Sequence, residues 1–276
     1  MRQPVLRSLL VAAAVLAGTV GFAAPSHAMV RADPDPDHVA VGSFWVSFGG
    51  GQPFFICTGT LVSSTVFVTA GHCVDYVVRY GGKAFVSFAQ KFPTNGAPPA
   101  DLVAAAAHLN PRYKTSNGTD LYQFDVSVLT LAKPSRVPKS AYGVLPTAGL
   151  LDQLKANGTL DSQTFTLSGY GTSSMVVDPM SGQGSPISFP DTGQRLQGML
   201  GFSALSASVL HENQRANAGF AGAGYGDSGG PTFLGTSNII LGVTSTGDIP
   251  CYSTNTAYRL DTQDARDFLG QFVALP

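Results

Sequence analysis

The chain consists of short runs of β-branched and aromatic residues that alternate with breaks rich in glycine, proline, asparagine and serine. The runs of the first half are FWVSF, FFICTGTLV, VFVTA, YVVRY, AFVSFA and DVSVLTLA, and those of the second half are QTFTLSGYG, RLQGMLGFSAL, NIILGVTSTG and TAYRLD. Runs of this length and spacing are typical of strands in an all-β sandwich or barrel. Two β modules of about 100 residues each fit the chain length better than one large module.

The first 28 residues have the pattern of a secretory signal peptide. Arg2 and Arg7 precede an apolar run over residues 9–17, and small residues flank His27 before an expected cut after Ala28. The apolar run is short for a membrane span and Pro25 follows it, although an uncleaved anchor is the alternative interpretation. We therefore predict a secreted, extracellular protein whose mature form has no membrane segment.

The rest of the chain divides into an arm and two modules. Prolines and aspartates in RADPDPDHVAVG predict an extended N-terminal arm without regular structure over residues 29–43. The first β module is predicted over 44–145 and the second over 146–276. Within the second, residues 172–194 are expected to form a long mobile surface loop. The tail predicts a helix over about 261–273, with Asp261 or Thr262 as its N-cap.

Charge and cysteine content exclude several classes of protein. The formal net charge is −1 and no run of Lys or Arg occurs, so nothing indicates a nucleic-acid partner. The cysteines Cys57, Cys73 and Cys251 include no CxxC pair and no Cys/His cluster, so no metal site is predicted. In an exported chain these cysteines are candidates for disulfides first.

One glycine-rich stretch, GYGDSGGP at 224–231, carries a candidate nucleophile, Ser228. Its sequence also fits the G-x-S-x-G elbow of α/β-hydrolases, but that class needs a histidine after the serine and none follows Ser228. The base must therefore lie upstream, where the mature chain offers His38, His72, His108 and His211. His72 stands out because it ends a β run and adjoins Cys73.

The motifs VTAGHC, DVSVLTL and GDSGGP together resemble the three signatures of the chymotrypsin/trypsin family of serine endopeptidases, and His72, Asp125 and Ser228 follow that family's order. TFTLSGYG, RLQG and LGVTSTG resemble further strands of the family, so the resemblance covers most of the chain from about Phe44. It implies two six-stranded antiparallel β-barrels followed by the C-terminal helix, and it implies no cofactor.

The resemblance also implies a role for each site residue. His72 would act as general base for Ser228, with Asp125 holding the imidazole, and the N–H groups of Gly226 and Ser228 would form the oxyanion hole. Asp120 is the competing acid, but it lies in a polar turn, whereas Asp125 leads into an apolar strand. A disulfide is implied between Cys57 and Cys73, and Cys251 is expected to be a buried free thiol or to pair with another molecule.

The residue before the serine departs from the family pattern. In the family, the acid at the position of Asp227 pairs with an N-terminal amine released by proteolysis, yet no basic residue followed by IVGG occurs here. We expect the equivalent N-terminus near Val30 or Arg31, delivered by signal cleavage or a short trim. Pairing of Asp227 inside the chain is the alternative.

The substrate pocket is expected to be uncharged. The resemblance places Gly222 at its base, where relatives that cleave after Lys or Arg have an aspartate, and Gly247 on its wall. Tyr225 is expected at the entrance and Ser245 in hydrogen-bond contact with Asp125. An inward-facing Asp248 would restore some preference for a basic side chain.

The sequence therefore predicts a secreted serine endopeptidase that acts on proteins or peptides through an acyl-enzyme, with an apolar pocket and with proteinaceous inhibitors as further partners. A catalytically silent binding protein on the same fold, or an esterase with the same triad, are the alternatives.

Overall fold

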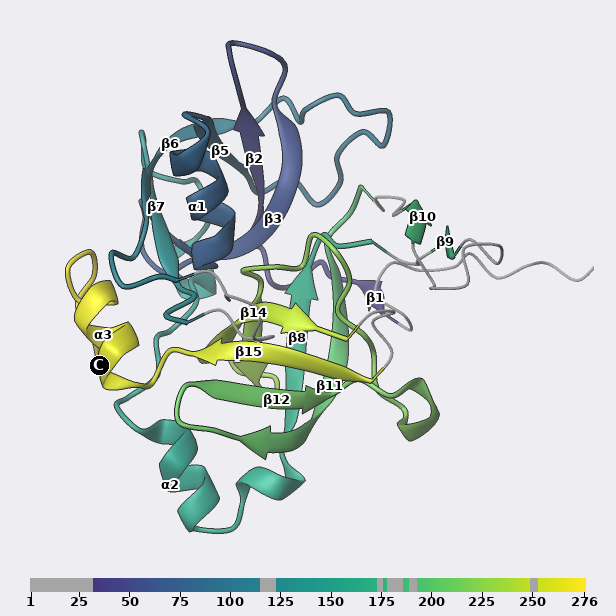
Figure 1. The fold of residues 1–276 in the computed structure, drawn as a ribbon, viewed down its shortest axis with the longest axis vertical. Coiled ribbons are helices and arrows are strands. Elements are labelled where there is room, and N and C mark those ends of the chain that lie inside the picture. The colour runs from purple at the N-terminus through teal and green to yellow at the C-terminus, as the bar shows by residue number, and fades with distance from the viewer. Residues whose placement is uncertain (1–31, 115–122, 173–175, 178–185, 189–192, 249–252) are drawn as a thin grey trace, which may run out of the picture.

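A computed structural model describes residues 32–114, 123–172, 176–177, 186–188, 193–248 and 253–276. It contains two antiparallel β-barrels, one formed by the first half of the chain and the other by the second half (Figure 1). The expected all-β fold with two six-stranded barrels is confirmed.

The first barrel closes in the order β2-β3-β4-β7-β6-β5, with β5 paired back to β2. Its strands are β2 (Val41–Ser47), β3 (Phe54–Leu61), β4 (Val66–Thr69), β5 (Lys83–Ser87), β6 (Val103–His108) and β7 (Ser127–Leu131). Its first strand thus begins three residues before the predicted start at Phe44.

The second barrel closes in the order β11-β12-β15-β14-β13-β8, because β8 pairs with both β13 and β11. Its strands are β8 (Thr164–Gly169), β11 (Leu196–Leu205), β12 (Val209–Asn213), β13 (Pro231–Leu234), β14 (Ile240–Gly247) and β15 (Thr254–Arg259). The predicted arm is not wholly irregular, because β1 (Asp33–Pro34) pairs with β11. Within the predicted 172–194 loop, β9 (Val176–Val177) pairs with β10 (Pro186–Ser188), and most of the remaining loop lies outside the described residues.

Strand β2 is buried on both faces, one inside its own barrel and one between the barrels. In β2, Phe44 and Val46 belong to the core of the first barrel, whereas Val41 and Trp45 belong to a cluster shared by both halves. Successive side chains of a strand point to opposite faces, so β2 is fully buried without interrupting its hydrophobic run. The shared cluster holds the two barrels together along the boundary at which the functional residues lie.

The helices correct the sequence prediction. The run YVVRY, predicted as a strand, lies in α1 (Gly71–Arg79) and its C-cap, and α2 (Leu150–Ala156) was not predicted. In α1 the buried residues Cys73, Val74 and Val77 follow helical spacing, so packing overrides the β propensity of the valines. The C-terminal helix, α3 (Gln263–Leu269), is shorter than the predicted 261–273.

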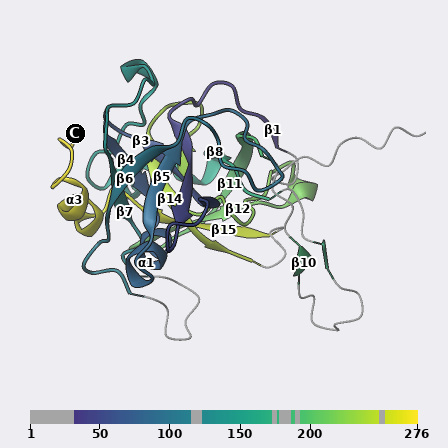
Figure 2. The same ribbon diagram turned by 90° about the horizontal axis from the view of Figure 1, so that it is seen from above.

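Helix α3 extends the shared cluster at one end of the molecule. Thr262 rather than Asp261 caps it, since the Thr262 side chain accepts from the Ala265 N–H. Phe268 and Leu269 pack into the cluster between the barrels. Figure 2 shows α3 at the end opposite to β10, which matches the view in Figure 1. No helix among the described residues is long and apolar enough to span a membrane; the predicted signal peptide lies outside them.

Candidate active site

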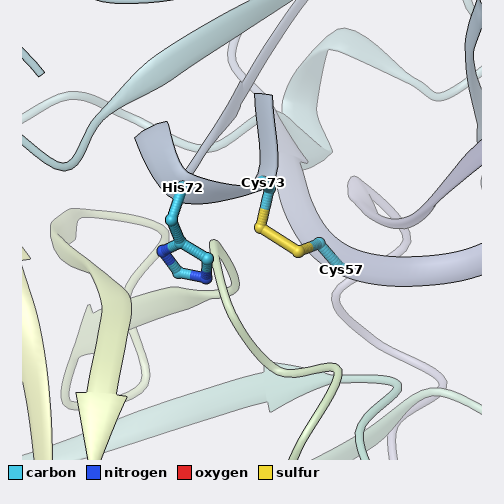
Figure 3. A group of neighbouring side chains, drawn as sticks. All are labelled: Cys57, His72 and Cys73. Carbon is cyan, nitrogen blue, oxygen red and sulfur yellow. A yellow bond between two sulfur atoms is a disulfide. The ribbon is translucent and has the colours of Figure 1, made fainter. Parts of the chain in front are cut away.

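His72 lies in the first turn of α1, next to a disulfide. Cys73, the following residue, is bonded to Cys57 of β3, so the predicted disulfide is present. Figure 3 shows the His72 ring and the disulfide leaving neighbouring positions of the same helical turn. The bond therefore fixes the helix start that carries His72 to the strand beside it.

The same three residues place potential metal ligands within 4.8 Å of one another. The thiolate is the form of cysteine that binds metals, and both sulfurs here are already bonded to each other. We interpret this group as a structural clamp beside His72.

Asp125 is fully buried and points at the start of α1. It follows Phe124, whose φ of 55° is in the left-handed region, and the Val126 N–H donates to the Phe124 carbonyl across it. This tight turn directs the carboxylate inward. At Gly71 a methyl group would lie 3.1 Å from Asp125 Oδ1, so glycine lets the carboxylate approach the helix closely.

The Asp125 carboxylate receives three hydrogen bonds. His72 Nδ1 lies 3.0 Å from Oδ2, the His72 backbone N–H donates to Oδ1 at 2.8 Å, and the Ser245 hydroxyl donates to Oδ2 at 2.5 Å. The contact expected between Ser245 and Asp125 is thus present. An imidazole that donates from Nδ1 keeps Nε2 as a proton acceptor. The His72 side chain is 20% exposed, so part of it reaches solvent.

Ser228 lies in a loop that is anchored to both barrels. Its carbonyl accepts from the Thr58 N–H of β3, and the Thr58 hydroxyl donates to the Gly226 carbonyl at 2.8 Å. On the other side, the Gly229 N–H donates to the Thr244 carbonyl of β14. The serine is therefore held at the boundary between the two barrels.

Two amide groups of this loop have no acceptor within the described chain. They belong to Gly226 and Ser228, whereas the N–H groups of Asp227, Gly229 and Gly230 all donate to carbonyls. Gly226 has a φ of 97°, and a methyl group there would lie 2.7 Å from the Phe55 ring. Two unpaired donors next to a candidate nucleophile can stabilise a developing oxyanion.

Asp227 is buried beneath this loop and is held by backbone donors. The Gly171 N–H and the Gly224 N–H each donate to its carboxylate at 2.8 Å. Burial raises the pKa of Asp227 to about 7, and the two backbone hydrogen bonds only partly oppose this effect. No cation among the described residues pairs with it; Val30 and Arg31, near the expected N-terminus, lie outside them.

His72 and Ser228 line the same cavity, which has a volume of about 470 Å³. Tyr225, which is 44% exposed, and Gly247 also line it. The remaining lining residues are Ile56, Cys57, Ala223, Gly224, Gly226, Thr244, Ser245, Thr246, Asp248 and Asn255. Gly222, the expected base, is described and buried but does not line the cavity, which begins at its neighbour Ala223.

Asp248 is the one carboxylate among the described lining residues. Its Oδ1 accepts from Gln214 Nε2 at 2.9 Å and from the N–H groups of Ser253 and Thr254 at 2.9 and 2.6 Å. These donors tie the carboxylate to the start of β15 and to the residue that follows β12.

Sequence reasoning missed Thr58 and Asn255. Thr58 holds the Ser228 loop from the other barrel, and Asn255 enters the cavity from β15. Thr58 lies in the predicted run FFICTGTLV next to Cys57, whereas Asn255 directly precedes the run TAYRLD and belongs to no predicted strand or motif. Asp120, the competing acid, and Cys251 lie outside the described residues.

The two-barrel fold, with the His72–Asp125 pair at a cavity that Ser228 also lines, defines a chymotrypsin-like class of protein. The family model described as Trypsin matches residues 35–268. The chain therefore belongs to the trypsin family and is a chymotrypsin-like serine endopeptidase.

Two relatives illustrate the likeness. The chain is 28% identical to "Fibrinolytic enzyme, isozyme C" of Lumbricus rubellus over 193 residues, which cover 68% of this chain and 75% of that protein. Its fold resembles that of neuropsin, a serine protease expressed in mouse brain, with a TM-score of 0.57 and 18% identity. That likeness covers 84% of this chain and 94% of the mouse protein.

Proposed function

We propose that the chain is a secreted serine endopeptidase that cleaves peptide bonds through an acyl-enzyme formed on Ser228. The observation that carries this proposal is the buried Asp125 carboxylate, which holds His72 at the cavity that Ser228 also lines. The unpaired N–H groups of Gly226 and Ser228 support the same assignment.

Each residue then has one chemical role. His72 Nε2 takes the Ser228 hydroxyl proton as Oγ bonds to the substrate carbonyl carbon, and the two N–H groups bind the resulting oxyanion. His72 returns the proton to the leaving amine as the C–N bond breaks, which leaves an ester on Ser228. A water molecule, deprotonated by His72, then hydrolyses this ester. Asp125 stabilises the transient imidazolium throughout.

A fluorophosphonate probe tests the proposal. We expect covalent labelling of the wild-type protein and none of Ser228→Ala, while Ser162→Ala, which changes an exposed serine, keeps the label. A folded wild-type sample without label would instead favour the silent binding protein. Turnover of small esters without cleavage of any peptide would favour the esterase.

The cavity supports an uncharged primary pocket. Ala223, Gly224 and Gly247 contribute no charge, and three donors already hold Asp248 Oδ1. A concave, largely apolar site of this kind suits an apolar or aromatic side chain. Protein and peptide substrates are the expected partners, and proteinaceous inhibitors that mimic them would use the same cavity.

We also infer that the mature N-terminus lies near Val30 or Arg31 and supplies an amine to Asp227. The buried Asp227 carboxylate and the pairing of β1 with β11 support this inference. N-terminal sequencing of the active secreted protein tests it. A start beyond about Val41 would contradict it, because β2 begins there.

A further inference from the structure

Asn255 brings a buried amide to the cavity from a strand that the catalytic groups do not use. Its side chain is only 1% exposed, yet it lines the cavity together with Thr244 and Gly247. In the sheet it lies between two partners, Glu212 on β12 and Gly247 on β14. Directly opposed residues share one face of a sheet. The Glu212 side chain therefore lies next to Asn255 on the β12 side, and Gly247, which has no side chain, lies next to it on the β14 side.

Glu212 fixes the orientation of the amide. The Asn255 Nδ2 donates to Glu212 Oε2 at 2.6 Å and lies 3.5 Å from the Thr244 hydroxyl. Glu212 is completely buried, and burial raises its pKa to about 7 against the lowering effect of the Asn255 hydrogen bond. Above that pH the carboxylate only accepts hydrogen bonds, so it requires the NH₂ group of Asn255 to face it.

The amide oxygen is then the atom left for a ligand. No donor in the described part of the chain hydrogen-bonds to Asn255 Oδ1. A methyl group at position 247 would lie 3.8 Å from this oxygen, so Gly247 leaves the space over it open. A buried acceptor beside an open cavity gains a hydrogen bond only from an entering group that carries a donor.

We infer that Asn255, oriented by Glu212, determines specificity by accepting a hydrogen bond from an uncharged substrate side chain that ends in an O–H or N–H donor. This inference rests on the proposed function, because it concerns the side chain that enters the cavity next to Ser228. Tyrosine fits this chemistry and the apolar walls together, since its ring is apolar and its hydroxyl can donate. Glu212 is a positioning residue that does not line the cavity itself.

Two peptides that differ only by tyrosine or phenylalanine at the residue before the cleaved bond test the inference at pH 8. We expect the wild-type kcat/KM to favour tyrosine by about 3- to 10-fold, the effect of one neutral hydrogen bond. Asn255→Leu should bring this ratio to about 1 while it retains cleavage of the phenylalanine peptide, which reports folded and active enzyme. Glu212→Gln should lower the ratio as well, because the amide of Asn255 is then free to turn.

Asn255→Leu leaves the Glu212 carboxyl buried without its donor, so the double variant Asn255→Leu/Glu212→Met is the second test. It removes the buried pair together, and it too should cleave both peptides equally. A tyrosine preference that persists in either variant, or equal rates in the wild type, would overturn the inference. A preference for lysine over norleucine that persists in Asn255→Leu would also overturn the inference, since it would indicate that Asp248 determines the specificity. Failure of the wild type to cleave any peptide would instead count against the proposed function.

Discussion

Asp125 joins both halves of the molecule through one carboxylate. It accepts from the backbone and side chain of His72 on α1, which belongs to the first half, and from Ser245 on β14 of the second barrel. A carboxylate with three donors has little freedom to rotate, so the imidazole beside it is held in one orientation. The position of His72 therefore depends on how the two barrels pack, and not only on its own helix.

The backbone conformation of Gly226 positions one N–H group of the proposed oxyanion hole. We expect Gly226→Ala to lower kcat/KM on a peptide substrate by about 10²–10³-fold, the effect of losing one oxyanion donor. The cause is that alanine disfavours a φ of 97° and its methyl group would lie 2.7 Å from Phe55, so the N–H must move.

Gly158→Ala is the matched control for this prediction. Gly158 also has a positive φ, of 73°, but nothing lies within 4 Å of a methyl group there, and it is remote in sequence from the site. It should cost some stability and leave kcat/KM unchanged. Equal losses of activity in the two variants would show that strain, rather than a displaced donor, explains the effect.

At the scale of elements, α1 is the main difference from the sequence prediction. The valines of YVVRY favour a strand in isolation, but Cys73 is tied to β3 and Val74 and Val77 pack into the first barrel. Tertiary contacts therefore decide the structure of this segment, and no local pattern shows them. By contrast, nine of the twelve barrel strands coincide with predicted runs, which are apolar and clearly bounded, whereas β6, β12 and β13 were not predicted.

The disulfide is predicted to stabilise this helix–strand junction. Replacing both cysteines, Cys57→Ala/Cys73→Ala, should lower the free energy of unfolding by about 3 kcal/mol, the chain-entropy value for a loop of this size. Urea denaturation of the inactive Ser228→Ala background gives the measurement without self-digestion. Reduction of the wild-type disulfide in the same background should produce a similar loss. A change below about 1 kcal/mol in both experiments would mean that barrel packing alone holds α1 in place.

At the scale of the whole molecule, the sequence motifs locate the candidate site but not its surroundings. His72 and Ser228 lie in specific motifs, and Asp125 is preferred to Asp120 because it leads into an apolar strand. The contacts of Asn255 on β15 depend on its register with the neighbouring strand β14 and with β12, which lies some 40 residues earlier in the sequence. Register follows from packing of the complete barrel, and therefore the pocket lining could not be read from residue types.

Asp227 links the stability of the whole chain to pH. Its pKa is raised to about 7 in the fold, whereas an exposed aspartate has a pKa near 3.8. Between these values the folded chain binds a proton that the unfolded chain does not, so the free energy of unfolding falls as the pH rises. The stabilising contribution of Asp227 is therefore fully present below about pH 4. It is lost as the pH rises through about 7. Glu212 acts in the same direction, because its pKa is also raised to about 7.

A comparison with Asp227→Asn isolates this contribution. Both chains are compared in the Ser228→Ala background with the N-terminal residues retained. We expect the chain with Asp227 to lose stability relative to the Asp227→Asn variant from pH 4 to pH 8, because only the aspartate loses its stabilising proton. The contribution of Glu212 cancels in this difference. The same comparison after trimming near Val30 should give the opposite trend, since a new amine beside Asp227 would favour the ionised carboxylate and lower its pKa. Urea denaturation at several pH values measures both trends. If the difference in the free energy of unfolding between the two chains is independent of pH in both the retained and the trimmed form, Asp227 keeps one protonation state whether or not an amine is present.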